Sequence, residues 1–329
     1  MALSKSVAGL FSGPKSCVFR KLSGAASSQL DLSGIFAPIP TPFNPDESLA
    51  FDKLEHNLGV WQKIPLRGYL VQGSNGEFKL LKDDERVEMV RRSRHFISKD
   101  KLLLAGSACE STRATIEMSN LMADAGADAV LIINPCYYKS AMNEETLLKY
   151  FWRVADECRM PVVLYNMPAN TGIDLSVPLI TKLAQHPNIA GLKDSGADVG
   201  KMAQVVHTTK GLGFQVLSGS AGLLLPALVV GCVGGINGFA NTNGAELCQL
   251  ISLFKEGKLE EAGELQRKIM HPNALITRIW NVPATKAVMD AGGQLYGGPC
   301  REPLAPVTKE QLKTLIEAFV KEGFLPQQK

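Results

Sequence analysis

The stretch Asn188-Ile189-Ala190-Gly191-Leu192-Lys193-Asp194-Ser195 runs from an apolar segment directly into a lysine. Such a segment is typical of a buried strand, and an ammonium is rarely buried without a partner. As ordinary structure, Lys193 would end the strand and extend its amine to solvent. At the mouth of a barrel, an apolar surrounding would instead favour the neutral amine, which is a nucleophile. The stretch alone favours the first interpretation, and the rest of the chain favours the second.

Short apolar runs alternate with amphipathic helical patterns on both sides of this stretch. Strands are predicted at Gly34–Pro40, Arg67–Gln72, Leu102–Gly106, Ala129–Asn134, Val162–Asn166, Ile189–Lys193, Phe214–Ser218 and Gly234–Phe239. Helices are predicted near 52–63, 83–98, 111–125, 144–157, 177–185, 197–209, 221–231 and 243–256. Because each parallel crossover needs a helix, this alternation predicts an α/β fold, a (β/α)8 TIM barrel. A doubly wound open sheet is the alternative, but no glycine-rich phosphate motif follows the first strand.

The segments that flank the barrel pattern differ from it in composition. Residues 1–30 are basic and serine-rich and contain no acid, which is typical of a mitochondrial transit peptide, although a leader without an address is the alternative. After residue 256 the pattern is purely helical, with helices predicted at Leu259–Met270, Pro283–Ala291 and Thr308–Glu322. We therefore expect a leader at 1–30, a barrel at 31–256 and a C-terminal helical extension at 257–329 packed on the barrel. The expected location is the mitochondrial matrix.

Composition and charge exclude several classes of function. The chain has 329 residues, 45% of them hydrophobic and 20% charged, and its net charge of +3 is too small to predict a nucleic-acid partner. No apolar run approaches the roughly 20 residues that cross a bilayer. The seven cysteines form no C-x-x-C and the five histidines form no H-x-x-x-H. These patterns predict a reducing compartment, no metal site and no cofactor.

Polar residues follow the predicted strands at their C-terminal ends, where TIM barrels carry their catalytic groups. They are Thr41, Gly73–Glu77, Ser107, Pro135–Tyr138, Tyr165–Asn166, Lys193–Ser195 and Gly219–Ser220. A lysine, tyrosines and hydroxyls without metal ligands favour Schiff-base chemistry on a carbonyl substrate.

Each of these groups also has an ordinary structural interpretation. The stretch Gly73-Ser74-Asn75-Gly76 is either a tight turn or a turn whose amides bind a carboxylate. Tyr165 is either a core tyrosine or a polar group of the site, and Tyr137 could be a surface aromatic. Cys136 is more typical of packing than of a nucleophile, because no histidine motif accompanies it.

Together, these motifs resemble the dihydrodipicolinate synthase and N-acetylneuraminate lyase superfamily of class I aldolases. The resemblance covers residue 34 to the C-terminus and rests on Gly73–Glu77, Pro135–Tyr138, Leu164–Gly172, Gly191–Ser195 and Leu217–Ser220. It implies a metal-independent enzyme without a cofactor that acts on a small 2-oxo acid. It also implies a homotetramer built from two dimers.

The resemblance assigns a role to each of seven residues. Lys193 would form the Schiff base and Tyr165 would transfer protons. Tyr137 would be a second tyrosine that reaches into the site of a neighbouring subunit. The substrate carboxylate next to the ketone would be bound, and the remainder of the site lined, by Ser74, Asn75, Ser195 and Gly219.

Within the superfamily, the leader and Gly297–Arg301 resemble the branch that cleaves 4-hydroxy-2-oxoglutarate to pyruvate and glyoxylate in hydroxyproline catabolism. The alternatives are an N-acetylneuraminate lyase, a dihydrodipicolinate synthase, an oxaloacetate decarboxylase and a pyruvate-binding scaffold without activity. Synthases of the superfamily have Thr-Thr where this chain has Ser74-Asn75, and a carboxylate-binding arginine where it has Asn170. These departures argue against the synthase reaction and leave open what binds the distal carboxylate.

Overall fold

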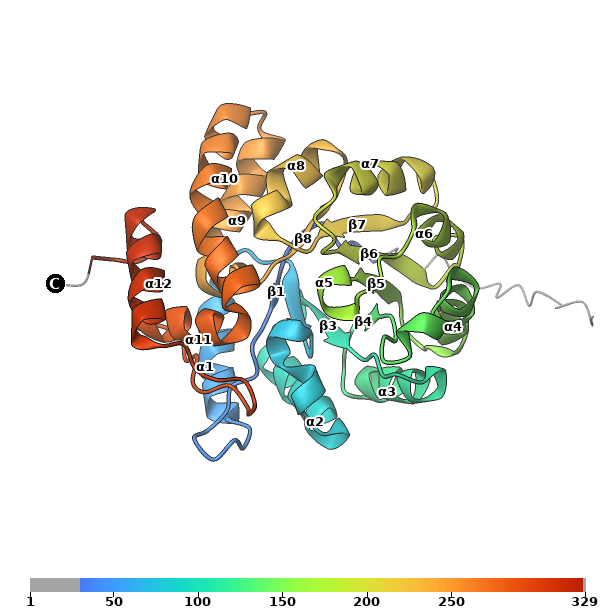
Figure 1. The fold of residues 1–329 in the computed structure, drawn as a ribbon, viewed down its shortest axis with the longest axis horizontal. Coiled ribbons are helices and arrows are strands. Elements are labelled where there is room, and N and C mark those ends of the chain that lie inside the picture. Colours follow the sequence, from blue (N-terminus) through green and yellow to red (C-terminus); the bar gives the residue numbers. More distant parts are fainter. Residues whose placement is uncertain (1–29, 328–329) are drawn as a thin grey trace, which may run out of the picture.

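The structure, a computed structural model, describes residues 30–327 and forms a closed barrel of parallel strands in the order β1 to β8, ringed by helices (Figure 1). The strands are β1 (Gly34–Pro38), β2 (Gly68–Val71), β3 (Leu102–Gly106), β4 (Ala129–Ile133), β5 (Val162–Asn166), β6 (Ile189–Asp194), β7 (Gln215–Ser218) and β8 (Gly234–Ile236). The predicted (β/α)8 TIM barrel is thereby confirmed. The predicted leader lies outside the described residues except for Leu30.

Backbone contact between glycines closes the barrel. Gly34 of β1 pairs with Gly234 of β8, and a Cβ on Gly234 would lie 2.0 Å from the carbonyl oxygen of Gly34. Only a residue without a side chain permits that approach. Alternate residues of the strands point to the barrel interior, where Phe36, Leu70 and Val163 belong to one apolar cluster.

A second, larger apolar cluster fills the space between the strands and the helices around them. Polar side chains fix the helix starts: Ser111 accepts a hydrogen bond from Ala114 N, and Asn143 accepts one from Thr146 N. The helices around the barrel are α1 (Phe51–Trp61), α2 (Asp83–Phe96), α3 (Thr112–Asp124), α4 (Glu144–Glu157), α5 (Pro168–Thr171), α6 (Val177–Leu183), α7 (Val199–Thr208), α8 (Leu224–Val229) and α9 (Ala240–Lys255).

The structure differs from the predicted boundaries at a few places. Strand β8 ends at Ile236 rather than Phe239, because the side chain of Asn237 donates to Ser218 O at 3.0 Å and the chain then turns into α9. The short helix α5 was not predicted; it begins at Pro168 and ends where Gly172 takes a φ of 65°.

The chain continues after the barrel as a set of helices. These are α10 (Leu259–Ala274), the π-helical segment η5 (Leu275–Ile279), α11 (Asn281–Ala291) and α12 (Lys309–Lys321). Helix α12 lies outside the ring of helices in Figure 1. Its Phe319 packs against Phe239 at the start of α9, with 5.8 Å between the ring centres. The helices thus pack on the barrel, while the division at residue 256 stays a prediction. In residues 30–327 no helix is both long and apolar enough to cross a bilayer.

Candidate active site

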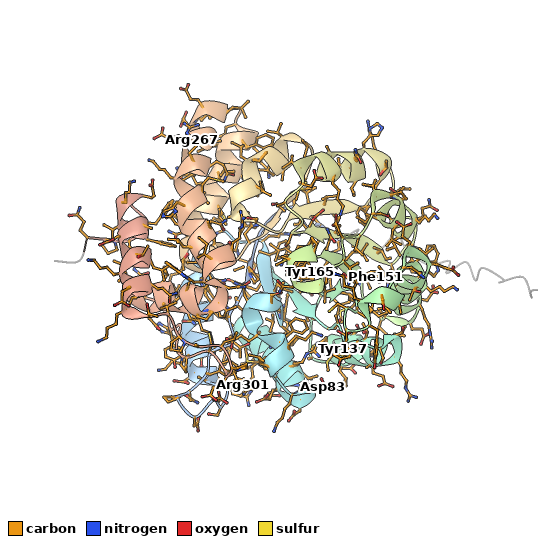
Figure 2. The ribbon with its side chains drawn as sticks, viewed as in Figure 1. Asp83, Tyr137, Phe151, Tyr165, Arg267 and Arg301 are labelled. Carbon is orange, nitrogen blue, oxygen red and sulfur yellow. The ribbon has the colours of Figure 1, made fainter. Side chains whose placement is uncertain are left out.

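Strand register brings Lys193 and Tyr165 together. Lys193 on β6 pairs directly with Tyr165 on β5, so both side chains point to the same side of the sheet, into the barrel. Their exposed fractions are 4% and 5%, and the Lys193 Nζ atom lies 4.1 Å from the centre of the Tyr165 ring. A buried amine therefore faces a buried phenol at the end of the barrel interior, as Figure 2 shows for Tyr165.

A pocket of about 520 Å³ opens above this pair, at the C-terminal ends of the strands. Ser74, Asn75, Ser195 and Gly219 line it together with Lys193 and Tyr165. Of the seven residues that the sequence predicts for the site, the structure thus brings six to one cavity. This is the end of a TIM barrel at which catalytic groups gather.

The turn after β2 presents two free amides to the pocket. Ser74–Gly76 form one turn of 3₁₀ helix, held in place by Thr41, whose hydroxyl donates to Gly76 O at 2.7 Å. Within residues 30–327 the backbone N–H groups of Ser74 and Asn75 donate to no acceptor. Consecutive amides without an acceptor, in residues that line a pocket, can form a concavity that suits a carboxylate. The geometry therefore favours the binding interpretation of this turn over the purely structural one.

Close packing of Gly219 against Ser195 shapes the opposite wall. Gly219 N donates to Asp194 O at 2.7 Å, and a Cβ at position 219 would lie 1.9 Å from the Ser195 Oγ atom. A side chain at position 219 would therefore displace the Ser195 hydroxyl from the pocket.

The surroundings of Tyr165 lower the pKa of its phenol. Burial is the largest single influence and raises its pKa, but the positive charge of Lys193 and hydrogen bonds with the side chains of Ser74, Ser195 and Lys193 together outweigh it. The pKa of Tyr165 therefore lies below the ordinary value of about 10. A phenolate within reach of the amine can act as a base.

A polar network supports the two strands from the outer side of the sheet. The Asn166 Nδ2 atom donates to Asp174 at 2.7 Å and to Asp194 at 3.1 Å, and Asp174 also pairs with Lys201. Burial raises the pKa of Asp194, which also accepts a hydrogen bond from Gly196 N. The network holds the ends of β5 and β6 in register. In the sequence, the only sign of this network is that Asn166 and Asp194 lie at the ends of predicted strands.

A buried ion pair fixes the turn after β2 to the C-terminal helices. Glu77 lies 2.6 Å from the Lys286 Nζ atom, and their side chains are 0% and 1% exposed. Lys286 also donates to Pro299 O at 2.7 Å, and Arg301 N donates to Glu77 at 2.9 Å. Glu77 is therefore structural, and so is the stretch Gly297–Arg301. No local pattern in the sequence pairs residues this far apart.

Sequence reasoning missed the contribution of the C-terminal helices to the pocket. One face of α10 and η5 lines it, with Met270, Asn273, Thr277 and Arg278 among the lining residues. These residues recur at spacings of three and four, so the helical period carried a signal. The helical period does not show which part of the barrel this face of α10 and η5 covers.

Tyr137 does not line the pocket. Its side chain is 79% exposed and packs edge-on against Tyr138, with ring centres 5.1 Å apart. The carboxylate of Glu110 accepts hydrogen bonds from Cys136 N and Tyr137 N and so anchors the loop. In Figure 2, Tyr165 lies at the centre of the barrel and Tyr137 lies toward the ring of helices.

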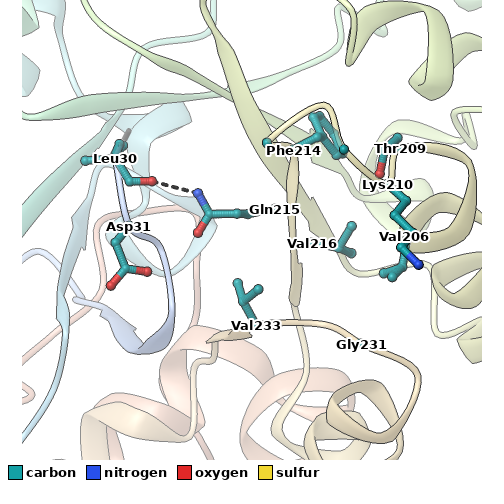
Figure 3. Close-up of a pocket in the computed structure, with 12 residues that line it drawn as sticks. Leu30, Asp31, Val206, Thr209, Lys210, Phe214, Gln215, Val216, Gly231 and Val233 are labelled. Carbon is teal, nitrogen blue, oxygen red and sulfur yellow. Dashed lines mark hydrogen bonds between the residues drawn. The ribbon is translucent and has the colours of Figure 1, made fainter. Parts of the chain in front are cut away.

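A different cavity, of about 400 Å³, lies at the other end of the barrel (Figure 3). Gln215 crosses it: its amide nitrogen donates to Leu30 O at 2.6 Å, and its amide oxygen accepts from Leu32 N at 2.8 Å. Leu32 is fully buried and joins the interior cluster. The segment that holds Leu32 therefore covers this end of the barrel interior.

No metal site is evident in the part of the chain that the structure describes, since no three histidine, cysteine or acidic side chains gather there. The described cysteines form no disulfide among themselves. The predictions of a metal-free, cofactor-free enzyme stay predictions.

Comparison with known proteins identifies the class. Residues 31–322 match the model of the dihydrodipicolinate synthetase family. The chain belongs to this family, which confirms the superfamily resemblance.

Particular relatives carry two different names. A 4-hydroxy-tetrahydrodipicolinate synthase of Methanothrix thermoacetophila is 31% identical over 88% of this chain and 96% of its own length. A protein of Emericella nidulans named probable 4-hydroxy-2-oxoglutarate aldolase, mitochondrial, is 32% identical over 87% of this chain and 93% of its own length.

Solved structures agree with the fold and the family. A dihydrodipicolinate synthase of Bacillus anthracis matches with a TM-score of 0.85 at 27% identity, over 89% of this chain and 99% of that one. A prophage protein of the same family from E. coli K12, in complex with pyruvate, matches with a TM-score of 0.83 at 29% identity and the same coverage. The comparisons support an enzyme of the lyase and synthase class and leave its substrate open.

Proposed function

We propose that this protein is a class I aldolase in which Lys193 forms a Schiff base with the ketone of 4-hydroxy-2-oxoglutarate, which is then cleaved to pyruvate and glyoxylate. The observation that carries the proposal is the Lys193–Tyr165 pair, with 4.1 Å between the amine and the ring centre, inside a pocket that also holds two free amides.

The chemistry follows from these groups. The neutral amine of Lys193 attacks the C2 carbonyl, and loss of water gives an iminium, which withdraws electrons from the adjacent carbons. Tyr165, as phenolate, removes the proton of the C4 hydroxyl, and the C3–C4 bond breaks to release glyoxylate. The remaining enamine takes a proton at C3, and hydrolysis of the resulting iminium releases pyruvate and regenerates the amine.

The carboxylate next to the ketone fits the turn after β2. In this proposal the free amides of Ser74 and Asn75 bind it, while Ser195 and Gly219 shape the wall beside the ketone. The Ser74 hydroxyl has a second role, because its hydrogen bond lowers the pKa of Tyr165 and so supports the base.

The second candidate is the synthase reaction, favoured by the name of the Methanothrix relative. It forms a carbon–carbon bond from the same enamine. Asn170 lines the pocket where synthases of the superfamily place an arginine, and Asn75 stands in place of a threonine. These two departures, together with the name of the Emericella relative, favour the aldolase.

Two experiments test the proposal. Borohydride reduction in the presence of pyruvate is expected to fix an adduct on Lys193, located by peptide mass spectrometry. An adduct on another lysine, or none, would defeat the Schiff-base assignment and favour the scaffold alternative. A comparison of kcat/KM across 4-hydroxy-2-oxoglutarate, N-acetylneuraminate, oxaloacetate and the synthase substrates then decides the reaction. The specific proposal fails if the first is not the best substrate.

We also propose that Tyr137 completes the site of a neighbouring subunit within a homotetramer. Two adjacent exposed tyrosines, 79% and 71% accessible, are more aromatic surface than a solvated loop needs, and aromatics are enriched at interfaces. Mixing inactive Lys193→Arg subunits with Tyr137→Phe subunits should restore part of the activity once exchange is confirmed by tagging. Confirmed mixed oligomers without recovery would place Tyr137 outside the neighbouring site.

Location and metal independence complete the proposal. The leader at 1–30 and the mitochondrial name of the Emericella relative support import into the mitochondrial matrix. Because the iminium supplies the electron withdrawal that a metal would otherwise supply, we expect full activity after exhaustive chelation.

A further inference from the structure

The walls of the pocket above Lys193 carry basic side chains and no carboxylate. Among the residues that line it, the only basic side chains are Lys193 and Arg278, and none is Asp or Glu. The amine of Lys193 is committed to the ketone in the proposed reaction. Arg278 is therefore the uncommitted basic side chain of this cavity.

Nothing in the described chain explains Arg278 as a structural residue. It lies in η5, its side chain is exposed to the pocket opening, and in residues 30–327 it makes no ion pair or hydrogen bond. Arg301, by contrast, binds Glu85 through two bonds of 2.7 and 2.8 Å. A guanidinium in a pocket without a counter-charge suits an anionic ligand.

The segment that carries Arg278 is shaped to face the pocket. Residues 275–279 form a π-helix closed by a hydrogen bond from Trp280 N to Leu275 O, and such segments are frequent at functional sites. Asn273, one turn earlier, also lines the pocket; it is 3% exposed, and its Oδ1 atom has no partner in the described residues. A buried amide oxygen without a partner is a second sign that this wall binds a polar group, and because this oxygen accepts hydrogen bonds it suits a hydroxyl of the ligand beside the carboxylate.

We propose that Arg278 binds the distal carboxylate of the substrate, so that the enzyme selects 2-oxo acids that carry a second carboxylate. The proposal rests on the proposed Schiff-base function. It assigns to Arg278 the carboxylate binding that an arginine performs in the synthases, at the position where this chain has Asn170. The two ends of the substrate are then bound by different elements: the turn after β2 holds the carboxylate beside the ketone, and η5 holds the far one.

Schiff-base trapping without turnover isolates this contact. The measured quantity is the concentration of 2-oxo acid at which borohydride traps half of the maximal adduct on Lys193. It is determined for 2-oxoglutarate and for 2-oxopentanoate, which has a methyl group in place of the distal carboxylate. Native protein should prefer 2-oxoglutarate. Arg278→Gln should weaken its trapping by about tenfold to a hundredfold, the range for loss of a hydrogen bond to a charged group, and change that of 2-oxopentanoate less than twofold. For Arg278→Lys, the half-saturating concentration of 2-oxoglutarate should lie between those of native protein and Arg278→Gln.

A matched control is available on the neighbouring helix. Arg267, labelled in Figure 2, is an exposed arginine of α10 that does not line the pocket. Arg267→Gln removes the same charge and should leave both half-saturating concentrations unchanged.

The outcomes separate this inference from the function on which it rests. Normal pyruvate trapping on Lys193 with equal use of both 2-oxo acids by native protein overturns the role of Arg278 and leaves the Schiff base intact. The role of Arg278 is also overturned if Arg278→Gln weakens the trapping of both acids equally or of neither. Absence of any pyruvate adduct on Lys193 overturns the proposed function, and the inference with it.

Discussion

Two regions of the molecule each bury a lysine to almost the same extent, but surround it differently. Lys286, under the C-terminal segment, is 1% exposed and lies 2.6 Å from the carboxylate of Glu77. Lys193, at the barrel mouth, is 4% exposed and has no acidic partner in the described residues; it lies over the ring of Tyr165. The carboxylate engages the amine of Lys286, whereas the amine of Lys193 is, in the proposed function, available to attack a ketone. The partner, rather than the burial, then distinguishes the two lysines.

The largest effect is expected from Lys193. Lys193→Arg should reduce kcat by on the order of 10⁴-fold or more, because a guanidinium keeps its proton and cannot attack the ketone. Lys193→Met should be equally inactive but more stable to thermal unfolding, by about 0.5–2 kcal/mol, because it removes a buried polar group that lacks a carboxylate partner. Residual turnover within tenfold of native protein, or a lower melting temperature for Lys193→Met, would break the contrast between the two lysines.

Tyr165→Phe should have the next largest effect. Loss of the phenol removes the base, and kcat should fall by about 10²–10⁴-fold. Pyruvate trapping on Lys193 should persist, because the amine and the carboxylate-binding turn remain. Trapping and turnover are measured on the same preparation. A variant that loses both equally would show that Tyr165 serves Schiff-base formation rather than cleavage.

Lys286→Met should mainly affect stability. The substitution leaves the Glu77 carboxylate buried without its partner, which costs about 3–5 kcal/mol of unfolding free energy. The double variant Glu77→Gln, Lys286→Met should recover most of that loss, because the amide still accepts from Arg301 N without burying a charge. Denaturant unfolding of the native protein, Lys286→Met and the double variant measures these differences in stability. Equal stability of the single and double variants would contradict the pairing.

Ser74→Ala should have the smallest effect and a diagnostic pH dependence. The Ser74 hydroxyl helps lower the pKa of Tyr165, so its removal raises that pKa. Because the phenolate is the active base, activity falls as pH drops through the pKa, and the acidic limb of the kcat profile should move to higher pH. We expect a loss of about tenfold at pH 7 that shrinks at higher pH. A uniform loss at every pH would indicate a role in binding alone.

These regions also differ in how far the sequence alone could predict them. Lys193, Tyr165 and the turn after β2 follow strands whose apolar pattern is local, so topology alone brings them to one end of the barrel. Arg278 and Lys286 lie on helices whose period predicts a buried face but not the element that it covers. The pairing of Glu77 with Lys286 depends on tertiary packing across most of the chain. The same holds for the network of Asn166, Asp174 and Lys201, which joins a strand end, a loop and a helix.

The pairing of β1 with β8 has a consequence for the synthesis of this chain. Gly34 emerges from the ribosome roughly 10–40 s before Gly234 at about 5–20 residues per second, and until then β1 lacks one of its two neighbours. The wall formed by α10 and η5 is made later still. The nascent chain therefore exposes unpaired strand edges and apolar surface for tens of seconds, which makes it prone to aggregation during that time. For the same reason the pocket around Lys193 is incomplete until nearly the whole chain has been translated.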